Sequence, residues 1–224
     1  MYLEKLFCDT LSSNARASVE AQHSFIYVWK GAATINGESA VEDSAVYAED
    51  FVDVRTGDAG TTLLRWELAQ ESDPLHLLIG EGSNSVLRMS RHIKMFELVP
   101  TSRWLFRLDC ILNAQGSTGL HAHPGSGIRC MLGANGESRV KSEKGEESVS
   151  SKPGDVWYEE GAYPIDSIRQ PGVATTFLRG MIFPPEFEKC HDTVIWIEGR
   201  PKWSGDVDPG KFVRHYLQKI VRLR

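Results

Sequence analysis

The segment TTLLRWEL at residues 61–68 recurs in this chain as TTFLRGMI at residues 175–182, and 175 − 61 gives an offset of 114. The stretch just before it, VRTGDAGTT at 54–62, matches IRQPGVATT at 168–176 with the same offset. Two further matches are DSAVY at 43–47 with GDVWY at 154–158, and SFIYVWKGA at 24–32 with SGIRCMLGA at 126–134. Because all four matches keep their order along the chain, they predict two similar domains.

The repeated segments have the composition of β-strands. They are rich in Val, Ile, Thr and aromatic residues, and Gly, Asn, Asp and Pro separate them. Many short strands with turn signals are typical of a β-sandwich or barrel, so we expect an all-β protein with domains at 1–95 and 96–224. Near the C-terminus a helix and a strand both stay open, because six apolar residues there follow helical spacing: Phe212, Val213, Tyr216, Leu217, Ile220 and Val221.

Composition narrows the classes of partner. The net charge of the 224 residues is −5 and no large cluster of Lys and Arg occurs, which argues against nucleic acid or an anionic membrane as the main partner. No segment has the apolar length of a signal peptide or approaches the roughly 20 apolar residues of a membrane helix. The four cysteines form no C-x-x-C pair, and we expect a reduced, cytoplasmic protein.

The stretch GLHAHPGSGIR, residues 119–129, carries the most specific chemical signal. On a strand, His121 and His123 would point to the same face, and the Pro-Gly that follows would end the strand. Three interpretations stay open from these residues: a metal site, a polar pocket without metal, and the remnant of a lost site.

The second copy resembles the cupin superfamily. Its first motif is approached by Gly119, His121, His123 and Gly133, and its second by Gly154 and Pro164. The resemblance implies two tandem jelly-roll barrels, a bicupin, with a metal or ligand inside the mouth of a barrel. The positions aligned with the two histidines in the first copy are Val19 and Ala21, so the first domain is expected to be degenerate and the second to carry the site.

Two of the four ligands usual in cupins are absent. Gly127 and Ile128 stand where the first motif has its glutamate, and Ile165 stands where the second motif has its histidine. A useful metal site would therefore need another ligand beside the histidine pair.

Glu159 is the candidate for the missing ligand. The repeat aligns Glu160 with Glu49, whereas Glu159 aligns with Ala48 and is special to the second copy. Two histidines and one carboxylate suit Fe(II), with Mn, Ni or Zn as alternatives, and leave open positions for a substrate.

Arg129 is a candidate for contact with a substrate. If position 127 points into the barrel, position 129 does so too, and a buried arginine needs an anionic partner. That partner would be a substrate carboxylate, Glu159 or Asp155.

These residues predict a cupin-type, metal-binding protein that acts on a small anionic or oxygen-rich molecule. As an enzyme it would be a metal-dependent, dioxygenase-like oxidoreductase or an isomerase, with Arg129 orienting the substrate. The alternative is a ligand-binding or sensor protein that neither catalyses a reaction nor binds a metal. Because cupin-like proteins commonly dimerise, the resemblance also implies a homodimer.

Overall fold

The computed structural model describes residues 1–93, 103–161, 163–190, 193–197 and 213–222. The chain divides into two compact units, Met1–His92 and Ile93–Arg222, and the predicted boundary between residues 95 and 96 lies outside the described residues. Apart from the 3-10 helix η1 (Pro185–Lys189), the regular elements of the described part are strands, so the all-β prediction is confirmed. Among the described residues, no helix has the length and apolar character needed to cross a membrane.

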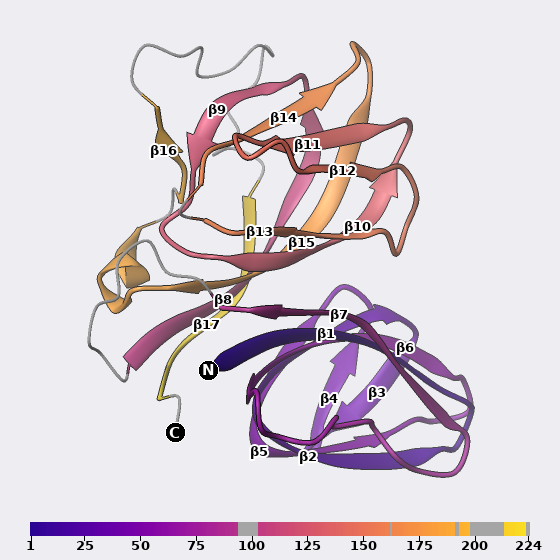
Figure 1. The fold of residues 1–224 in the computed structure, drawn as a ribbon. Helices are drawn as coiled ribbons and strands as arrows, with labels where there is room; N and C mark the ends of the chain where they lie inside the picture. The colour runs from indigo at the N-terminus through magenta and orange to yellow at the C-terminus, as the bar shows by residue number, and fades with distance from the viewer. Residues whose placement is uncertain (94–102, 162, 191–192, 198–212, 223–224) are drawn as a thin grey trace. The chain divides into compact units, whose positions relative to one another are not determined.

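The first domain is built from one antiparallel sheet (Figure 1). Its seven strands lie in the order β4-β3-β5-β2-β6-β1-β7. Their bounds are β1 Tyr2–Leu11, β2 Arg16–Lys30, β3 Ala32–Ile35, β4 Glu38–Val41, β5 Ala45–Arg55, β6 Thr61–Gln70 and β7 Ser83–His92. The sheet encloses an aliphatic core to which β2, β5 and β6 contribute Ile26, Val28, Val52, Val54 and Leu63.

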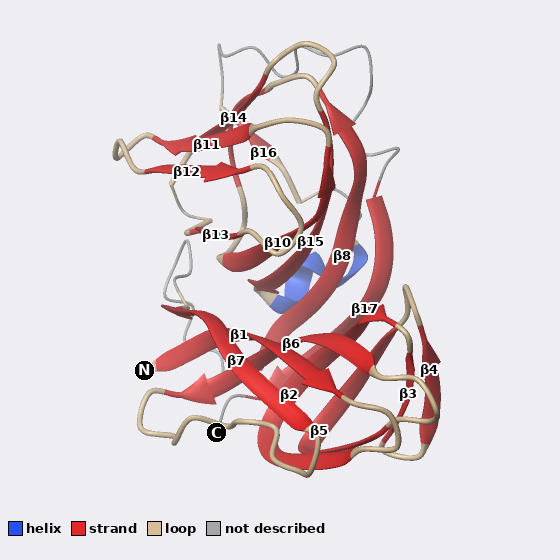
Figure 2. Cartoon of the chain, turned by 90° about the vertical axis from the view of Figure 1, so that its right-hand side faces the viewer, coloured by secondary structure: helices blue, strands red, loops and turns tan. Residues whose placement is uncertain are grey.

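The second domain has two five-stranded sheets (Figure 2). The first sheet has the order β13-β10-β15-β8-β17 and contains β8 Arg103–Gln115, β10 Gly127–Ala134, β13 Val156–Glu159, β15 Ala174–Phe183 and β17 Val213–Arg222. The second has the order β12-β11-β14-β9-β16 and contains β9 Thr118–Ala122, β11 Ser138–Ser142, β12 Glu147–Ser150, β14 Ile165–Arg169 and β16 Ile195–Trp196. One core cluster joins Met131, Trp157 and Phe177 of the first sheet with Val140 and Ile165 of the second, so the sheets pack face to face.

The sequence repeat corresponds to a structural repeat. TTLLRWEL lies in β6, between β2 and β1, and TTFLRGMI lies in β15, between β10 and β8. In each domain the repeated segment is thus an inner strand of its sheet, and the strand carrying the SFIYVWKGA or SGIRCMLGA segment lies beside it. The strand-by-strand order of the repeat is the same in both domains.

The helical spacing near the C-terminus is misleading, because residues 213–222 form strand β17, which pairs with β8. The register shifts between His215 and Leu217, as it does at a β-bulge. A bulge reverses the alternation of inward and outward side chains, so partly buried residues occur as neighbours in one strand. Tyr216 and Leu217 form such a pair, and their spacing imitates that of a helix.

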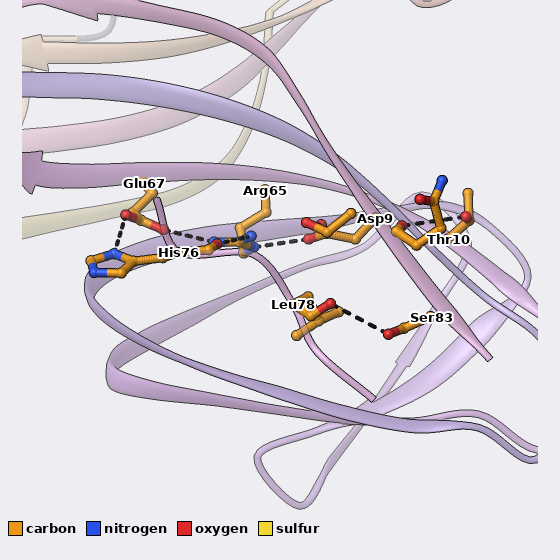
Figure 3. A network of polar contacts seen from close by, with 9 residues as sticks. Asp9, Thr10, Arg65, Glu67, His76, Leu78 and Ser83 are labelled. Carbon is orange, nitrogen blue, oxygen red and sulfur yellow. Dashed lines mark hydrogen bonds and ion pairs between the residues drawn. The ribbon is translucent and has the colours of Figure 1, made fainter. Parts of the chain in front are cut away.

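A network of buried charges lies inside the first domain (Figure 3). The guanidinium of Arg65 donates through Nε to Asp9 at 2.8 Å, through Nη1 to Glu67 at 2.7 Å and through Nη2 to the His76 carbonyl at 2.9 Å. Nδ1 of His76 lies 2.6 Å from the other oxygen of Glu67, and Arg65 stacks on the ring of Phe7. These contacts fix the segment around His76 to the two neighbouring strands β1 and β6.

Candidate functional site

The predicted histidine pair lies at the end of β9. His121 belongs to the strand, and His123 follows its last residue, Ala122. Both side chains are buried and line one pocket of the second domain. Their ring centroids are 5.0 Å apart and their planes are almost perpendicular, at 87°. The structure therefore brings the two imidazoles together.

Both imidazoles are fixed through Nδ1. This atom lies 2.8 Å from the Gly119 carbonyl in His121 and 2.8 Å from the Thr193 carbonyl in His123. A carbonyl oxygen only accepts hydrogen bonds, so Nδ1 must be the donor in each ring. This arrangement leaves Nε2 for other contacts, as in histidines that bind metals.

A close backbone contact brings Glu159 to the histidine pair. Glu159 is the last residue of β13, and the His123 amide donates to the Gly161 carbonyl at 3.0 Å. Gly161 has a φ of +77°, and a Cβ at this position would collide with the backbone of Gly125. Only glycine permits this approach. As a result, Nε2 of His123 lies 3.2 Å from Oε2 of Glu159.

The carboxylate of Glu159 already has three partners within the protein. Besides His123, Nη2 of Arg129 lies 2.7 Å from Oε2, and Nε1 of Trp157 donates to Oε1 at 2.8 Å. Burial alone would raise the pKa of Glu159, but the adjacent Arg129 guanidinium and His123 hold it well below its ordinary value. Glu159 is thus a carboxylate anion stabilised from within the protein.

The two histidines have different neighbours. Nδ1 of His123 faces the Thr193 carbonyl, and its Nε2 faces the Glu159 carboxylate. Burial, and then the neighbouring His123, lowers the pKa of His121 to about 4. At neutral pH, His121 is therefore uncharged and its Nε2 carries a lone pair.

Arg129 is fully buried and bound to other groups of the protein. Its guanidinium contacts Glu159 and donates to the Gly127 carbonyl, and it does not belong to the described residues that line the pocket. Asp155, another expected partner, accepts hydrogen bonds from the amides of Ser151 and Lys152 instead. Of the three predicted partners of Arg129, the structure provides Glu159, and contact with a substrate stays a prediction.

The predicted ligands meet the needs of a metal ion only in part. Across the described ranges, no group of three or more His, Cys, Asp or Glu side chains is arranged to hold one. His121 and His123 offer nitrogen donors, but Glu159 is held by Arg129 and Trp157, and metal sites of this kind use at least three protein ligands. As arranged, these residues do not fit a resident divalent metal, and the roles of His121, His123 and Glu159 as ligands stay predictions.

The pocket lies between the two sheets of the second domain. Its apolar walls are formed by Ile111, Val140, Trp157, Ile165, Phe177 and Trp196. The charged and titratable groups that line it are His121, His123, Glu159, Arg169 and Arg179, and Thr118 and Ser167 add two hydroxyl groups. Apolar walls with a few converging polar groups are the usual form of a small-molecule site.

Arg169 is the pocket residue that the sequence did not single out. It is the last residue of β14, and the repeat aligns it with Arg55 of the first domain. The side chain of Arg169 is buried, whereas that of Arg55 is exposed. The burial of its side chain was the missing signal, and sequence alone does not contain it.

Comparisons with known proteins give similarity at the level of the fold. The chain matches no family model, and no curated protein has a detectably similar sequence. Among solved structures, a cupin 2 conserved barrel domain protein from Leptotrichia buccalis is 13% identical, with a TM-score of 0.43, and the match covers 79% of this chain and 84% of that one. A mutant of salicylate 1,2-dioxygenase from Pseudoaminobacter salicylatoxidans is 12% identical, with a TM-score of 0.48. The match covers 96% of this chain and 74% of that one.

Both matches have TM-scores below 0.5, so they record a likeness to these structures and carry no further argument. At such low identities they indicate nothing about the ligand of this chain. The chemistry of its pocket has to be derived from its own residues.

Proposed function

We propose that this chain, a two-domain protein of the cupin fold, binds a small molecule inside its second domain. The observation that carries the proposal is the pocket between the two sheets, where aromatic and aliphatic walls meet buried polar groups. A folded protein rarely keeps several buried polar side chains around a cavity unless they interact with something.

The polar groups would orient the bound molecule. His121 is neutral and has its Nδ1 proton committed to Gly119, so Nε2 would accept a hydrogen bond from the ligand. The apolar body of the ligand would pack against Trp157, Phe177 and Trp196. Binding and orientation follow from this geometry, and a particular reaction does not.

The pocket can be tested by filling it. Ala114 lines the cavity, and Ala114→Phe would place a ring in the space of the ligand. We expect benzoate to raise the melting temperature of the wild-type protein and to have no effect on this variant. Val149→Phe is the matched control, because Val149 is an exposed residue of β12. Equal stabilisation of the wild type and the filled variant would reject the pocket as the binding site.

A metal-dependent, dioxygenase-like enzyme is the second candidate function. The observation in its favour is that both imidazoles donate through Nδ1 to carbonyl groups, which is how metal-bound histidines are commonly held. Fe(II), or Mn, Ni or Zn in its place, would supply Lewis-acid or redox chemistry at this end of the pocket. Before Glu159 could serve as the third ligand, it would have to leave Arg129 and Trp157.

Metal analysis decides between the two candidates. Under the second, the protein purified anaerobically holds a transition metal in stoichiometric amount, and His121→Ala or His123→Ala removes it. A wild-type protein that takes up no transition metal under these conditions excludes the enzyme and leaves the binding function standing.

A further inference from the structure

Arg169 places a positive charge on the wall of the pocket. Its side chain is only 8% exposed, and it lines the same cavity as the two histidines. Within the protein it is held by neutral groups: Nε donates to the Thr175 hydroxyl at 3.1 Å, and Nη1 donates to the Gly116 carbonyl at 3.0 Å. These two contacts fix the guanidinium in place without compensating its charge.

No carboxylate in the described part of the chain forms an ion pair with Arg169. Glu159, which lines the pocket, is bound to Arg129 at 2.7 Å. Asp109 accepts two hydrogen bonds from another lining residue, Arg179, at 2.7 and 2.9 Å. Burial lowers the pKa of Arg169 to about 10, and only the more distant charge of Glu159 opposes this effect. A buried cation without a counterion is unfavourable, and such groups concentrate at binding sites.

Ile168, the residue before Arg169, shows that an apolar side chain was available for burial at this point of the strand. Ile168 is 43% exposed, whereas Arg169 points inward. In the first domain the aligned residues have the opposite arrangement, with Val54 fully buried and Arg55 on the surface beside Asp53. Because side chains alternate along a strand, a shift of one residue would bury Ile168 and expose Arg169. The second domain exposes the isoleucine and buries the charge.

We infer that Arg169 binds the carboxylate of the ligand, and that the ligand is a small monocarboxylic acid with a compact apolar body. The inference rests on the proposed function, because it assigns a chemical class to the molecule in the same pocket. A guanidinium binds a carboxylate through two parallel hydrogen bonds, which gives both charge compensation and orientation. Because Arg169 contributes one uncompensated positive charge, we expect the ligand to carry one negative charge.

The size and walls of the cavity limit the rest of the molecule. A cavity of about 70 Å³ exceeds several-fold the roughly 10–15 Å³ that one water occupies, and suits a small organic acid. The rings of Trp157, Phe177 and Trp196 favour a flat apolar body.

Benzoate and benzamide are matched probes, since they share size and shape and differ in charge. We expect the wild-type protein to bind benzoate roughly 10–100-fold more tightly than benzamide, as measured by calorimetric titration. Arg169→Gln should abolish this preference by weakening benzoate binding, while the affinity for benzamide stays within about threefold. Arg169→Lys keeps the charge and should retain part of the preference.

Arg55→Gln is the matched control, because it removes the aligned arginine from the surface of the other domain. It should leave the affinities for both probes unchanged. Equal binding of benzoate and benzamide by the wild-type protein would overturn the inference while leaving the pocket function intact, and so would a preference that survives in Arg169→Gln. If neither probe binds, the proposed function fails together with the inference. The comparison within the wild type holds even if a variant does not fold.

Discussion

The two domains each bury an arginine, but with different surroundings. Arg65 of the first domain has two carboxylates, those of Asp9 and Glu67, and lies in a network whose charges are balanced. Arg169 of the second domain has a hydroxyl and a carbonyl, and no carboxylate among the described residues pairs with it. The same type of side chain thus stabilises the interior of one domain and leaves an unbalanced charge in the other.

This difference indicates which of the two domains has a site for an anionic ligand. In the first domain the buried charge of Arg65 is compensated by the carboxylates of Asp9 and Glu67, so this network requires no charged ligand. In the second domain Arg129 and Arg179 are balanced by Glu159 and Asp109 in the same manner. The buried Arg107 also pairs with no carboxylate among the described residues, but four neutral acceptors bind it and it does not line the pocket. On the pocket wall, the uncompensated charge is therefore that of Arg169. An anionic molecule in the pocket would compensate the charge of Arg169.

The largest expected effect comes from breaking the balanced network. Arg65→Met leaves Asp9 and Glu67 buried without their cation, and should lower the free energy of unfolding by about 3–5 kcal/mol. Urea denaturation would measure this change in the free energy of unfolding. The exposed Arg55→Met should change the same quantity by less than about 0.5 kcal/mol. Similar values for the two variants would show that the network does not stabilise the first domain.

Glu159→Gln should have the next largest effect. It leaves the fully buried Arg129 without its carboxylate, at a cost of about 3 kcal/mol in the free energy of unfolding. The neighbouring Glu160→Gln weakens the more exposed ion pair with Lys144 and should cost less than about 1 kcal/mol. If Glu159→Gln were as stable as the wild type, the Arg129–Glu159 pair would not hold the site together.

The pH dependence of stability tests the environment of His121. Its pKa is about 4 in the folded protein and near 6.5 when unfolded, so between these values only the unfolded chain takes up the proton. Stability should therefore fall as the pH drops from 6.5 to 4, by roughly 3 kcal/mol, and this residue contributes no change above pH 6.5.

Denaturation curves at several pH values would measure this loss as the difference between the wild type and His121→Gln. His92→Gln, at an exposed histidine of the first domain, should follow the wild type. Parallel curves for the wild type and His121→Gln would contradict the burial of a neutral imidazole.

The smallest expected effect has the opposite sign. Without ligand, Arg169→Gln removes an uncompensated buried charge and should raise the melting temperature by about 2–4 °C, which corresponds to roughly 1 kcal/mol. Arg169→Lys keeps the charge and should give no such gain. A clear decrease for Arg169→Gln would mean that Arg169 stabilises the second domain as Arg65 stabilises the first.

Much of the fold follows from residue types and their order. The β-rich composition and the repeat around TTLLRWEL and TTFLRGMI predict strands in two equivalent sets, and the structure has them in β6 and β15. The bulge near Tyr216 could not be predicted in this way, because it depends on pairing with β8, and the sequence therefore left helix and strand both open there. Local patterns therefore predict strands well except where a distant partner changes their alternation.

The part of the site that is built from residues close together in the sequence could be predicted. His121 and His123 lie two residues apart, and the strand places them together. Glu159 joins them because Gly161 allows the chain to approach Gly125, a contact between residues far apart in sequence. The sequence did not predict the role of Arg169. The repeat aligns it with Arg55, which is the same residue type, but the side chain of Arg169 is buried and that of Arg55 is exposed.

The pairing of β17 with β8 has a consequence for the order in which the domains form during synthesis. Strands β1 to β7 lie within the first 92 residues, so the first domain has all of them once that segment leaves the ribosome. Strand β8, Arg103–Gln115, has one neighbour at 174–183 and the other only at 213–222. During translation its second edge has no partner for about a hundred residues, and unpaired edges promote aggregation. We therefore expect nascent chains that stop before β17 to depend on chaperones more than chains that stop after β7.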